Sequence, residues 1–326
     1  PILGTIILTT LPEFAAPLVQ WSTFLYAALL LLIVLLIPGG IADLLDFRGR
    51  AALPQHREIA PRPELLGAVL GKPDRSQKMS LHGIQLHFGG VKAIDGIDVE
   101  IRAGEVHGLI GPNGSGKTTT LNVISGYYRP TAGELRLNGN ALPVETTPER
   151  AAHRIARTFQ TPRLIGDASV LENVMIGGTI DGQASFVESM LSLPRHHQDE
   201  RALRDAALKA LAAVGLESLA DVRADRLQHS ELRFMEIARA LMLRPAFLLL
   251  DEPAAGLSGE EIRRLGALIT AISREGVAVL LVEHHADLIF DICDTVTVLN
   301  LGKVLAAGTP AEIRAHKEVV SAYLGA

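Results

Sequence analysis

A glycine-rich segment that ends in a lysine and a threonine has the residue types needed to hold a phosphate chain. Gly111–Thr118 reads GPNGSGKT and matches the spacing GxxxxGK[ST]. It follows the apolar run Val106–Ile110 and precedes a helical pattern at Thr118–Ser125. Glycines let backbone N–H groups approach phosphate oxygens, and a helix N-terminus adds the positive end of its dipole. A chance turn is the alternative, and the flanking strand and helix patterns disfavour it.

Each residue of this segment has an expected role in binding a nucleoside triphosphate. Lys117 reaches the β- and γ-phosphates, and Thr118 holds Mg²⁺. The remaining residues expected to contact the nucleotide here are Gly111, Asn113, Gly114, Ser115, Gly116 and Thr119. The sequence therefore predicts a phosphate-binding loop between a strand and a helix.

Two adjacent carboxylates follow a second apolar run. Phe247–Leu250 has the length of a strand and is followed directly by Asp251 and Glu252. Asp251 can hold the metal through water while Glu252 polarises an attacking water, as phosphoryl transfer to water requires. The alternative is a pair of simply solvated acids, and the phosphate-binding loop upstream favours the catalytic interpretation.

These residues need a parallel α/β core to bring them together. Val106–Ile110, Phe247–Leu250 and Val277–Val282 are apolar runs of strand length, as is typical of parallel strands covered on both faces. Glu261–Glu275 lies between the last two and repeats apolar residues at helical spacing, with Gly276 as its C-cap. Three further strand-like runs predict an antiparallel β flank: Gly83–His87, Ile97–Ile101 and Glu134–Leu137.

Charge and cysteine content exclude some partners and indicate a compartment. The chain has 326 residues and a formal net charge of -5, which does not provide the strongly basic face that nucleic acid binding favours. Cys293 is the single cysteine, so the chain can form neither an internal disulfide nor a cysteine zinc cluster. These features fit a domain in a reducing compartment, without nucleic acid as a partner.

The N-terminal region predicts a membrane-spanning helix. Residues 18–37 carry no formal charge and, at about 1.5 Å per residue, are long enough to cross the hydrocarbon core. Trp21 and Tyr26 suit an interface, and arginines follow the run, which places its C-terminal end in the cytoplasm. A buried helix and a signal peptide are the alternatives. The apolar residues 2–11 are interpreted as the tail of a preceding span, so the chain would be a fragment.

The expected organisation has three parts. Residues 1–47 form the end of a membrane domain, and residues 48–78 form a linker because they are rich in proline and charge and have no sustained period. Residues 79–326 form the α/β domain.

Residues 79–326 resemble the ABC ATPase family, whose motifs stand here in family order. The resemblance implies a P-loop fold with a RecA-like parallel core, an antiparallel β subdomain and a helical subdomain. It implies that Phe88 stacks on adenine, although a core position in the β flank is the alternative. It also makes Gln160 the Q-loop residue that contacts Mg²⁺ and His284 the switch histidine at the γ-phosphate. A structural histidine is the alternative for His284.

Within that family, the chain most resembles the branched-chain amino acid uptake type. The stretches that carry this resemblance are residues 156–178, 236–257 and 296–313, while residues 11–45 resemble the last span of the partner permease. The resemblance implies an ATPase in the bacterial cytoplasmic membrane, with its catalytic domain on the cytoplasmic side and ATP and Mg²⁺ as cofactors. Its partners would be a second ATPase subunit, permease subunits and an extracytoplasmic solute-binding protein. An exporter ATPase of the lipopolysaccharide type and a non-transport ABC protein are the alternatives.

The signature that this family presents to its partner's ATP departs from the usual LSGGQ. Leu227–Glu231 reads LQHSE, so a polar side chain or a histidine stands where glycine normally lets backbone donors approach the phosphate. Ser230 is expected to cap the helix and contact the nucleotide, and Glu231 to add negative charge near the γ-phosphate. The sequence thus predicts ATP binding in this subunit and slow hydrolysis opposite its signature.

Overall fold

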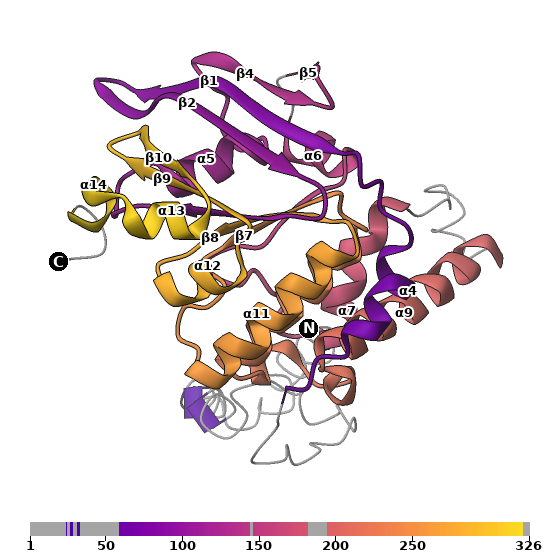
Figure 1. Ribbon diagram of the computed structural model, residues 1–326. Helices are drawn as coiled ribbons and strands as arrows, with labels where there is room; N and C mark the ends of the chain where they lie inside the picture. Colours follow the sequence, from indigo (N-terminus) through magenta and orange to yellow (C-terminus); the bar gives the residue numbers. More distant parts are fainter. Residues whose placement is uncertain are drawn as a thin grey trace, which may run out of the picture. The chain divides into compact units, whose positions relative to one another are not determined.

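The computed structural model describes residues 59–143, 146–181 and 194–321, together with Phe24, Ala27, Ala28, Leu31 and Leu32. The chain divides into two compact units, Pro1–Arg57 and Glu58–Ala326. The second unit is shown in Figure 1 as two sheets with helices around them. Most of the predicted span 18–37 lies outside the described residues, and the five residues described within it are helical. No described helix has both the length and the hydropathy that a membrane crossing requires.

The larger sheet has six strands in the order β10-β9-β3-β8-β7-β6. Neighbours from β9 to β6 are parallel, and β10 is an antiparallel edge strand. Every residue of β3, β7 and β8 is buried, as the apolar runs predicted. The strands are β3 Val106–Ile110, β6 Ile155–Arg157, β7 Phe247–Asp251, β8 Ala278–Val282, β9 Thr295–Asn300 and β10 Lys303–Gly308.

The smaller sheet is antiparallel, in the order β2-β1-β4-β5, and confirms the expected β flank. The predicted short runs are parts of longer strands, because β1 and β2 pair along almost their whole length. Apolar residues of both sheets and of helix α5 form one buried cluster between them. The strands are β1 Lys78–Phe88, β2 Val91–Arg102, β4 Ala132–Leu137 and β5 Asn140–Leu142.

Helices cover the parallel sheet and build a separate helical region from α7, α9 and α10, which pack on one another. Helix α11 confirms the predicted helix 261–275, and it buries the expected apolar stripe against the sheet. The helices are α4 Leu66–Leu70, α5 Lys117–Ile124, α6 Thr147–Ala152, α7 Val170–Met175, α9 Pro194–Val214, α10 His229–Leu241, α11 Gly259–Arg274, α12 Ala286–Ile292, α13 Pro310–Ala315 and α14 Lys317–Val319. Short 3-10 helices are η2 Pro63–Leu65, η3 Ile176–Asp181, η4 Glu217–Leu219 and η5 Ala224–Arg226.

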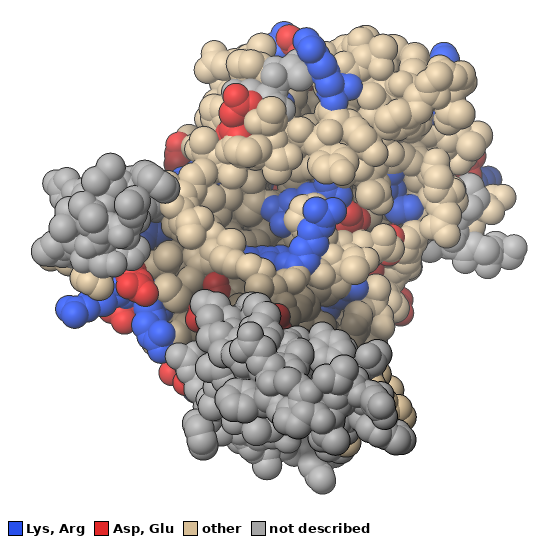
Figure 2. Space-filling model, turned by 180° about the vertical axis from the view of Figure 1, so that it is seen from behind, with Lys and Arg blue, Asp and Glu red and all other residues tan. Residues whose placement is uncertain are grey.

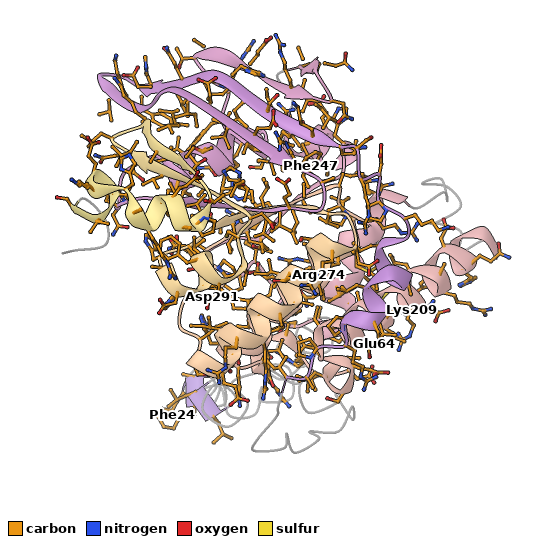
Figure 3. The ribbon with its side chains drawn as sticks, viewed as in Figure 1. Phe24, Glu64, Lys209, Phe247, Arg274 and Asp291 are labelled. Atoms are coloured by element: carbon orange, nitrogen blue, oxygen red, sulfur yellow. The ribbon has the colours of Figure 1, made fainter. Side chains whose placement is uncertain are left out.

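Residues 63–70, in the second half of the expected linker 48–78, form η2 and α4, which pack on α9 and α11. The Arg62 N–H donates to the Ala213 carbonyl of α9 at 2.9 Å, and Arg264 of α11 donates to the Ile59 carbonyl at 2.8 Å. In Figure 3, Glu64 of η2 and Lys209 of α9 mark two elements that pack together here. Four apolar side chains of residues 59–70 are buried although the segment is rich in proline: Ile59, Leu66, Val69 and Leu70.

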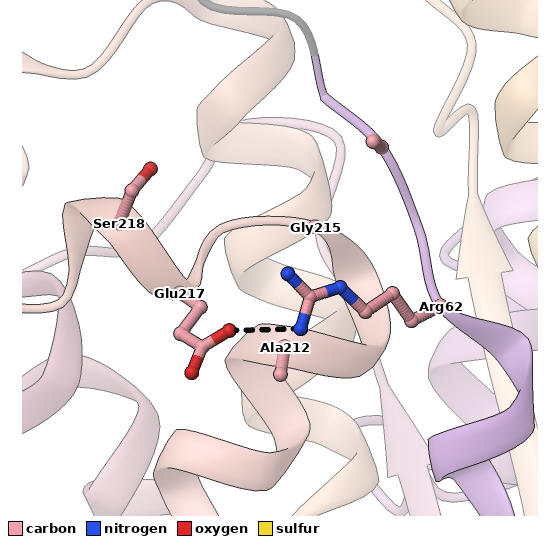
Figure 4. Close-up of a pocket in the computed structure, with 6 residues that line it drawn as sticks. Arg62, Ala212, Gly215, Glu217 and Ser218 are labelled. Atoms are coloured by element: carbon pink, nitrogen blue, oxygen red, sulfur yellow. Dashed lines mark hydrogen bonds and ion pairs between the residues drawn. The ribbon is translucent and has the colours of Figure 1, made fainter.

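A pocket of about 320 Å³ lies beside this segment (Figure 4). Arg62 donates to the Glu217 carboxylate across it at 3.1 Å, and both side chains are more than half exposed. Such an exposed pair contributes little to stability. The lining residues are Ala60, Arg62, Ala212, Gly215, Glu217 and Ser218, and none of them is a predicted site residue.

His107 is a buried histidine at the second position of strand β3. Its two ring nitrogens lie 2.9 Å from the hydroxyls of Thr297 and Thr295 on the neighbouring strand β9. Burial lowers the pKa of His107 from its ordinary 6.5 to about 4, because the charged ring would lose its hydration. The folded chain therefore binds fewer protons than the unfolded chain between these two values.

We predict that this histidine makes the fold weaken as the pH falls. The stability that depends on the neutral ring is fully present above the pKa of the unfolded chain and is lost as the pH drops toward the pKa of the folded chain. The free energy of unfolding should therefore fall by roughly 1 kcal/mol between about pH 7.5 and about pH 5.5. Urea unfolding of the wild type and of His107→Gln at the two pH values measures the effect. The free energy of unfolding should change less with pH in His107→Gln than in the wild type. An equal change in both proteins would contradict the role given to His107.

Candidate functional site

The phosphate-binding loop runs from the end of β3 to the start of α5, as the sequence predicted. The Lys117 ammonium is buried and donates to the carbonyls of Gly111 at 2.7 Å and Pro112 at 3.0 Å. Burial lowers the pKa of Lys117, while the nearby carboxylates of Glu252 and Asp251 oppose that shift. Asn113, Gly114 and Thr118 are exposed, Thr119 is half-buried, and Ser115 and Gly116 are buried beneath them. The loop thus holds a lysine and exposed groups where an anion can reach them.

The glycine at the start of the loop is required by close backbone contacts. Gly111 has φ +149°, and a Cβ there would lie 2.1 Å from the Leu299 carbonyl oxygen and 2.7 Å from Ser115 Oγ. Gly116 has φ +106°, and its Cβ would lie 2.8 Å from the Ala93 carbonyl oxygen of β2. These two glycines let the loop fit against β9 and β2, which fixes its curvature.

Asp251 ends strand β7 and is almost fully buried. Arg157 of β6 donates to its Oδ2 at 2.9 Å, whereas Oδ1 is buried and has no hydrogen-bond partner among the described residues. Burial raises the pKa of Asp251, although Arg157 pulls the pKa in the opposite direction. A buried carboxylate oxygen without a partner is costly unless a ligand or water satisfies it.

Glu252 is held between two side chains that the sequence assigned to the same site. Gln160 Nε2 donates to Glu252 Oε2 at 2.8 Å, and His284 Nε2 lies 2.7 Å from Glu252 Oε1. Glu252 has φ +49°, a left-handed conformation that is unusual for a residue with a side chain. Its N–H donates to the Val282 carbonyl at 2.9 Å, which holds this conformation. The structure therefore brings Glu252, Gln160 and His284 together.

The predicted Mg²⁺ ligands fit a cation bound mainly by oxygen. The exposed Thr118 hydroxyl, the unpartnered Asp251 Oδ1 and the carbonyl oxygen of Gln160 are hard donors of the kind Mg²⁺ prefers. Within the described residues, no cluster of three or more His, Cys, Asp or Glu side chains could hold a metal alone. In nucleotide enzymes Mg²⁺ is usually bound by a few protein oxygens together with phosphate oxygens.

Phe88 lies at the turn between β1 and β2 and is 47% exposed, so it is not a core residue of the β flank. Its ring meets Tyr128 edge to face, with ring centroids 5.1 Å apart. Tyr127 in turn packs against Tyr128 at 5.3 Å. The sequence reasoning missed this tyrosine pair, whose signal was two adjacent aromatic residues directly after the loop helix. The exposed Phe88 ring is available for stacking on a base.

The signature region differs from the expectation in how its polar residues are used. Gln228 is the N-cap of α10, and its N–H donates to the Glu231 carboxylate at 2.8 Å. Ser230 is the second residue of the helix and not its cap, so that part of the prediction is wrong. His229 Nε2 lies 2.8 Å from the Ala255 carbonyl in the segment after β7. Because Glu231 caps its own helix, its buried carboxylate is directed to the backbone.

Two charged residues of the site escaped the sequence reasoning. Glu283 is buried and accepts from the N–H groups of Ala254 at 2.6 Å and His284 at 3.0 Å, which joins the two loops that follow β7 and β8. Burial raises the pKa of Glu283. Arg157 is the other, through its contact with Asp251. The available signal was a single charged residue next to an apolar strand in each case.

Charge on the face shown in Figure 2 is mixed. Basic side chains gather in a central hollow, and acidic side chains lie beside them.

Comparison with known proteins agrees with this site. A family model described as "ABC transporter" matches residues 94–255, and one described as "Branched-chain amino acid ATP-binding cassette transporter" matches residues 303–326. The high-affinity branched-chain amino acid transport ATP-binding protein BraF of Pseudomonas aeruginosa is 37% identical over 76% of this chain and 97% of that protein. The corresponding LivG protein of Escherichia coli K12 is 35% identical over the same shares.

Solved structures give the same result. A nucleotide-free ATP-binding cassette from an ABC transporter superposes with a TM-score of 0.67 and 28% identity, over 77% of this chain and all of that one. An ATP-binding cassette in its ADP conformation gives a TM-score of 0.66 at 28% identity, over 77% of this chain and 99% of that one. The chain belongs to the ATP-binding proteins of ABC transporters, and its activity is that of an ATPase.

We predict that Gly111→Ala disrupts the loop because the new Cβ meets the backbone of β9. Gly139→Ala is the matched control, since Gly139 also has positive φ, +84°, but open space around it. The control should lose only about 1 kcal/mol from backbone strain. Gly111→Ala should lose more stability in urea unfolding and bind ATP at least about tenfold more weakly. Equal stability losses in the two variants would show that the contact with Leu299 is relaxed without cost.

Proposed function

We propose that this chain uses Mg²⁺ and ATP to power the import of branched-chain amino acids, or a related small solute, across the bacterial cytoplasmic membrane. The ATPase domain would lie on the cytoplasmic side and work with a second ATPase subunit, permease subunits and an extracytoplasmic solute-binding protein. The match of residues 303–326 to the branched-chain family supports the solute class, as do the names of the BraF and LivG relatives. The contact of Glu252 with Gln160 and His284 carries the catalytic part of the proposal.

Each side chain of the site has a part in hydrolysis. Phe88 stacks on the base, and the loop amides with Lys117 hold the phosphate oxygens. Thr118, Asp251 and Gln160 hold Mg²⁺, which supplies positive charge to the phosphates when bound. Glu252 accepts a hydrogen bond from the attacking water, and His284 fixes Glu252 and reaches toward the γ-phosphate.

Four substitutions test the site together. Lys117→Ala should abolish ATP binding and turnover, because it removes the ammonium that holds the phosphate oxygens together with the loop amides. Glu252→Gln should keep ATP affinity and lose turnover by about 10² or more, since an amide cannot take the proton from water. Phe88→Ala and His284→Ala should weaken ATP binding and turnover respectively. Nucleotide binding and phosphate release measure these effects, and unchanged ATP affinity in Lys117→Ala would refute the phosphate-binding role of the loop.

The solute is tested by uptake. Radiolabelled leucine uptake into vesicles that contain the complete transporter should require ATP inside and should vanish with Glu252→Gln. ATP-dependent efflux of a lipid-linked saccharide would instead favour the exporter of the lipopolysaccharide type. Recovery of the chain in the soluble cytosol, without any permease, would favour a non-transport ABC protein.

We also propose that the N-terminal residues 1–47 are the end of a permease, with a membrane span at residues 18–37. The uncharged run and the arginines that follow it support this proposal. Residues 59–70 pack on α9 and α11, and residues 38–58 would join the proposed span to this segment. An open reading frame for further spans directly upstream would support the fusion, and a start codon at this point would contradict it.

The altered signature favours an asymmetric pair of ATP sites. His229 occupies the space over Gly256 and binds the Ala255 carbonyl, so this segment presents a ring where a glycine would present backbone donors. The ATP bound to the partner, which this signature would contact, is then hydrolysed slowly. The ATP bound at Lys117 is hydrolysed with Glu252 and His284 of this chain and the signature of the partner.

We predict that restoring small residues speeds the slow site. Gln228→Ser combined with His229→Gly and Ser230→Gly should raise turnover at the partner's ATP in the assembled complex, and should leave ATP affinity at Lys117 unchanged. Phosphate release is measured with the partner's own catalytic glutamate intact and this chain carrying Glu252→Gln. Equal and fast turnover at both sites before the substitutions would remove the asymmetry.

A further inference from the structure

Arg157 is a buried charged side chain whose position was not explained by any motif. It ends strand β6, three residues before Gln160. Its Nη2 donates to Asp251 Oδ2 at 2.9 Å, and the two side chains are only 8% and 3% exposed. Two charges removed from water in this way are costly unless their geometry is well defined.

The other side of the guanidinium is anchored to the loop helix α5. Arg157 Nη1 donates to Asn122 Oδ1 at 2.6 Å and to Ser125 Oγ at 3.0 Å. The planar group is therefore held at both ends, between the helix that starts at Lys117 and the strand that ends at Asp251. Because a guanidinium is rigid, these anchors fix its direction as well as its position.

This arrangement treats the two oxygens of Asp251 differently. Oδ2 is taken by Arg157, while Oδ1 is buried and has no partner among the described residues. A carboxylate that served only to pair with arginine would gain more from two parallel bonds. The single bond therefore leaves one oxygen directed to something else.

We propose that Arg157 is a positioning residue for the Mg²⁺ of the nucleotide site. It holds Asp251 so that Oδ1 is presented to the hydration shell of the metal, and it ties that orientation to the loop helix through Asn122. This inference rests on the proposed Mg²⁺ site, whose expected protein groups are Thr118, Gln160 and Asp251. Groups that orient metal ligands from behind contribute strongly to metal affinity.

Removing Arg157 would take away the hydrogen-bond donor of Asp251 Oδ2, and the carboxylate could then rotate. Lys117 is the other cation whose charge acts on Asp251. Without the guanidinium, Asp251 can turn toward that ammonium, and its Oδ1 no longer points in one direction. The loss should therefore appear in metal affinity more than in affinity for ATP without metal.

The test measures metal binding directly, with Mn²⁺ as the probe. The full chain carries Glu252→Gln so that ATP is not consumed, and free Mn²⁺ is followed by its electron paramagnetic resonance signal in the presence of ATP. Arg157→Gln should weaken Mn²⁺ binding by about tenfold or more, in the range found for groups behind metal ligands. Arg157→Lys should lose about threefold, because one ammonium keeps the charge but cannot span both anchors.

Arg163→Gln is the matched control. Arg163 stacks on the same Phe159 ring as Arg157, at 4.7 Å against 5.2 Å, but makes no contact to Asp251 among the described residues. The Mn²⁺ affinity of this variant should stay within about twofold of the parent, since Arg163 does not orient the Asp251 carboxylate. ATP affinity in excess EDTA should be the same in all these chains.

The outcomes separate the two proposals. Unchanged Mn²⁺ affinity in a folded Arg157→Gln overturns the role of Arg157, as does an equal loss in Arg163→Gln. If Arg157→Gln does not fold, Arg157→Lys carries the test, and parental Mn²⁺ affinity there overturns the inference. Absence of ATP-dependent Mn²⁺ binding in the parent chain would instead refute the proposed metal site itself.

Discussion

Parallel pairing of four neighbouring strands is the constraint on which this site depends. Strands β6, β7, β8 and β3 run in the same direction, so their carboxyl ends meet at one edge of the sheet. Gln160 follows β6, Glu252 follows β7 and His284 follows β8. Side chains that are far apart in the sequence therefore lie at hydrogen-bond distances of 2.8 Å or less. The phosphate-binding loop leaves β3 at the same edge. Ligands of open α/β sheets bind at such edges.

Buried charge beneath this edge supports the groups exposed above it. Arg157, Asp251 and Glu283 have little access to water, and each has hydrogen bonds that point it in one direction. The ion pair between Arg157 and Asp251 contributes little net stability, since desolvation offsets its attraction. The value of these buried charges lies in orientation: Glu283 joins the loops after β7 and β8, and Arg157 joins β7 to the loop helix.

The segments that depart from the family pattern are accommodated by local hydrogen bonds. Helix α10 starts with a capping interaction in which the Glu231 carboxylate accepts from the Gln228 N–H, which directs this acid to the backbone. His229 bonds the backbone next to Gly256, whose positive φ and missing side chain make room for the ring.

Residues 59–70 use four buried apolar side chains to attach the start of the catalytic unit to α9 and α11.

Sequence by itself determined the strand that leads into the loop, the loop with Lys117 and the acids at the end of β7, because local spacing and apolar runs specify these features without distant contacts. It also predicted both sheets and helix α11. The helical character of residues 63–70 escaped it, because their short apolar pattern becomes stable only when packed on α9. Only the tertiary structure decided that Arg157 meets Asp251, because that contact depends on which elements become neighbours and no spacing along the chain encodes it. The turn of Glu231 to its own helix is different, since this contact spans only three residues and is a local capping interaction.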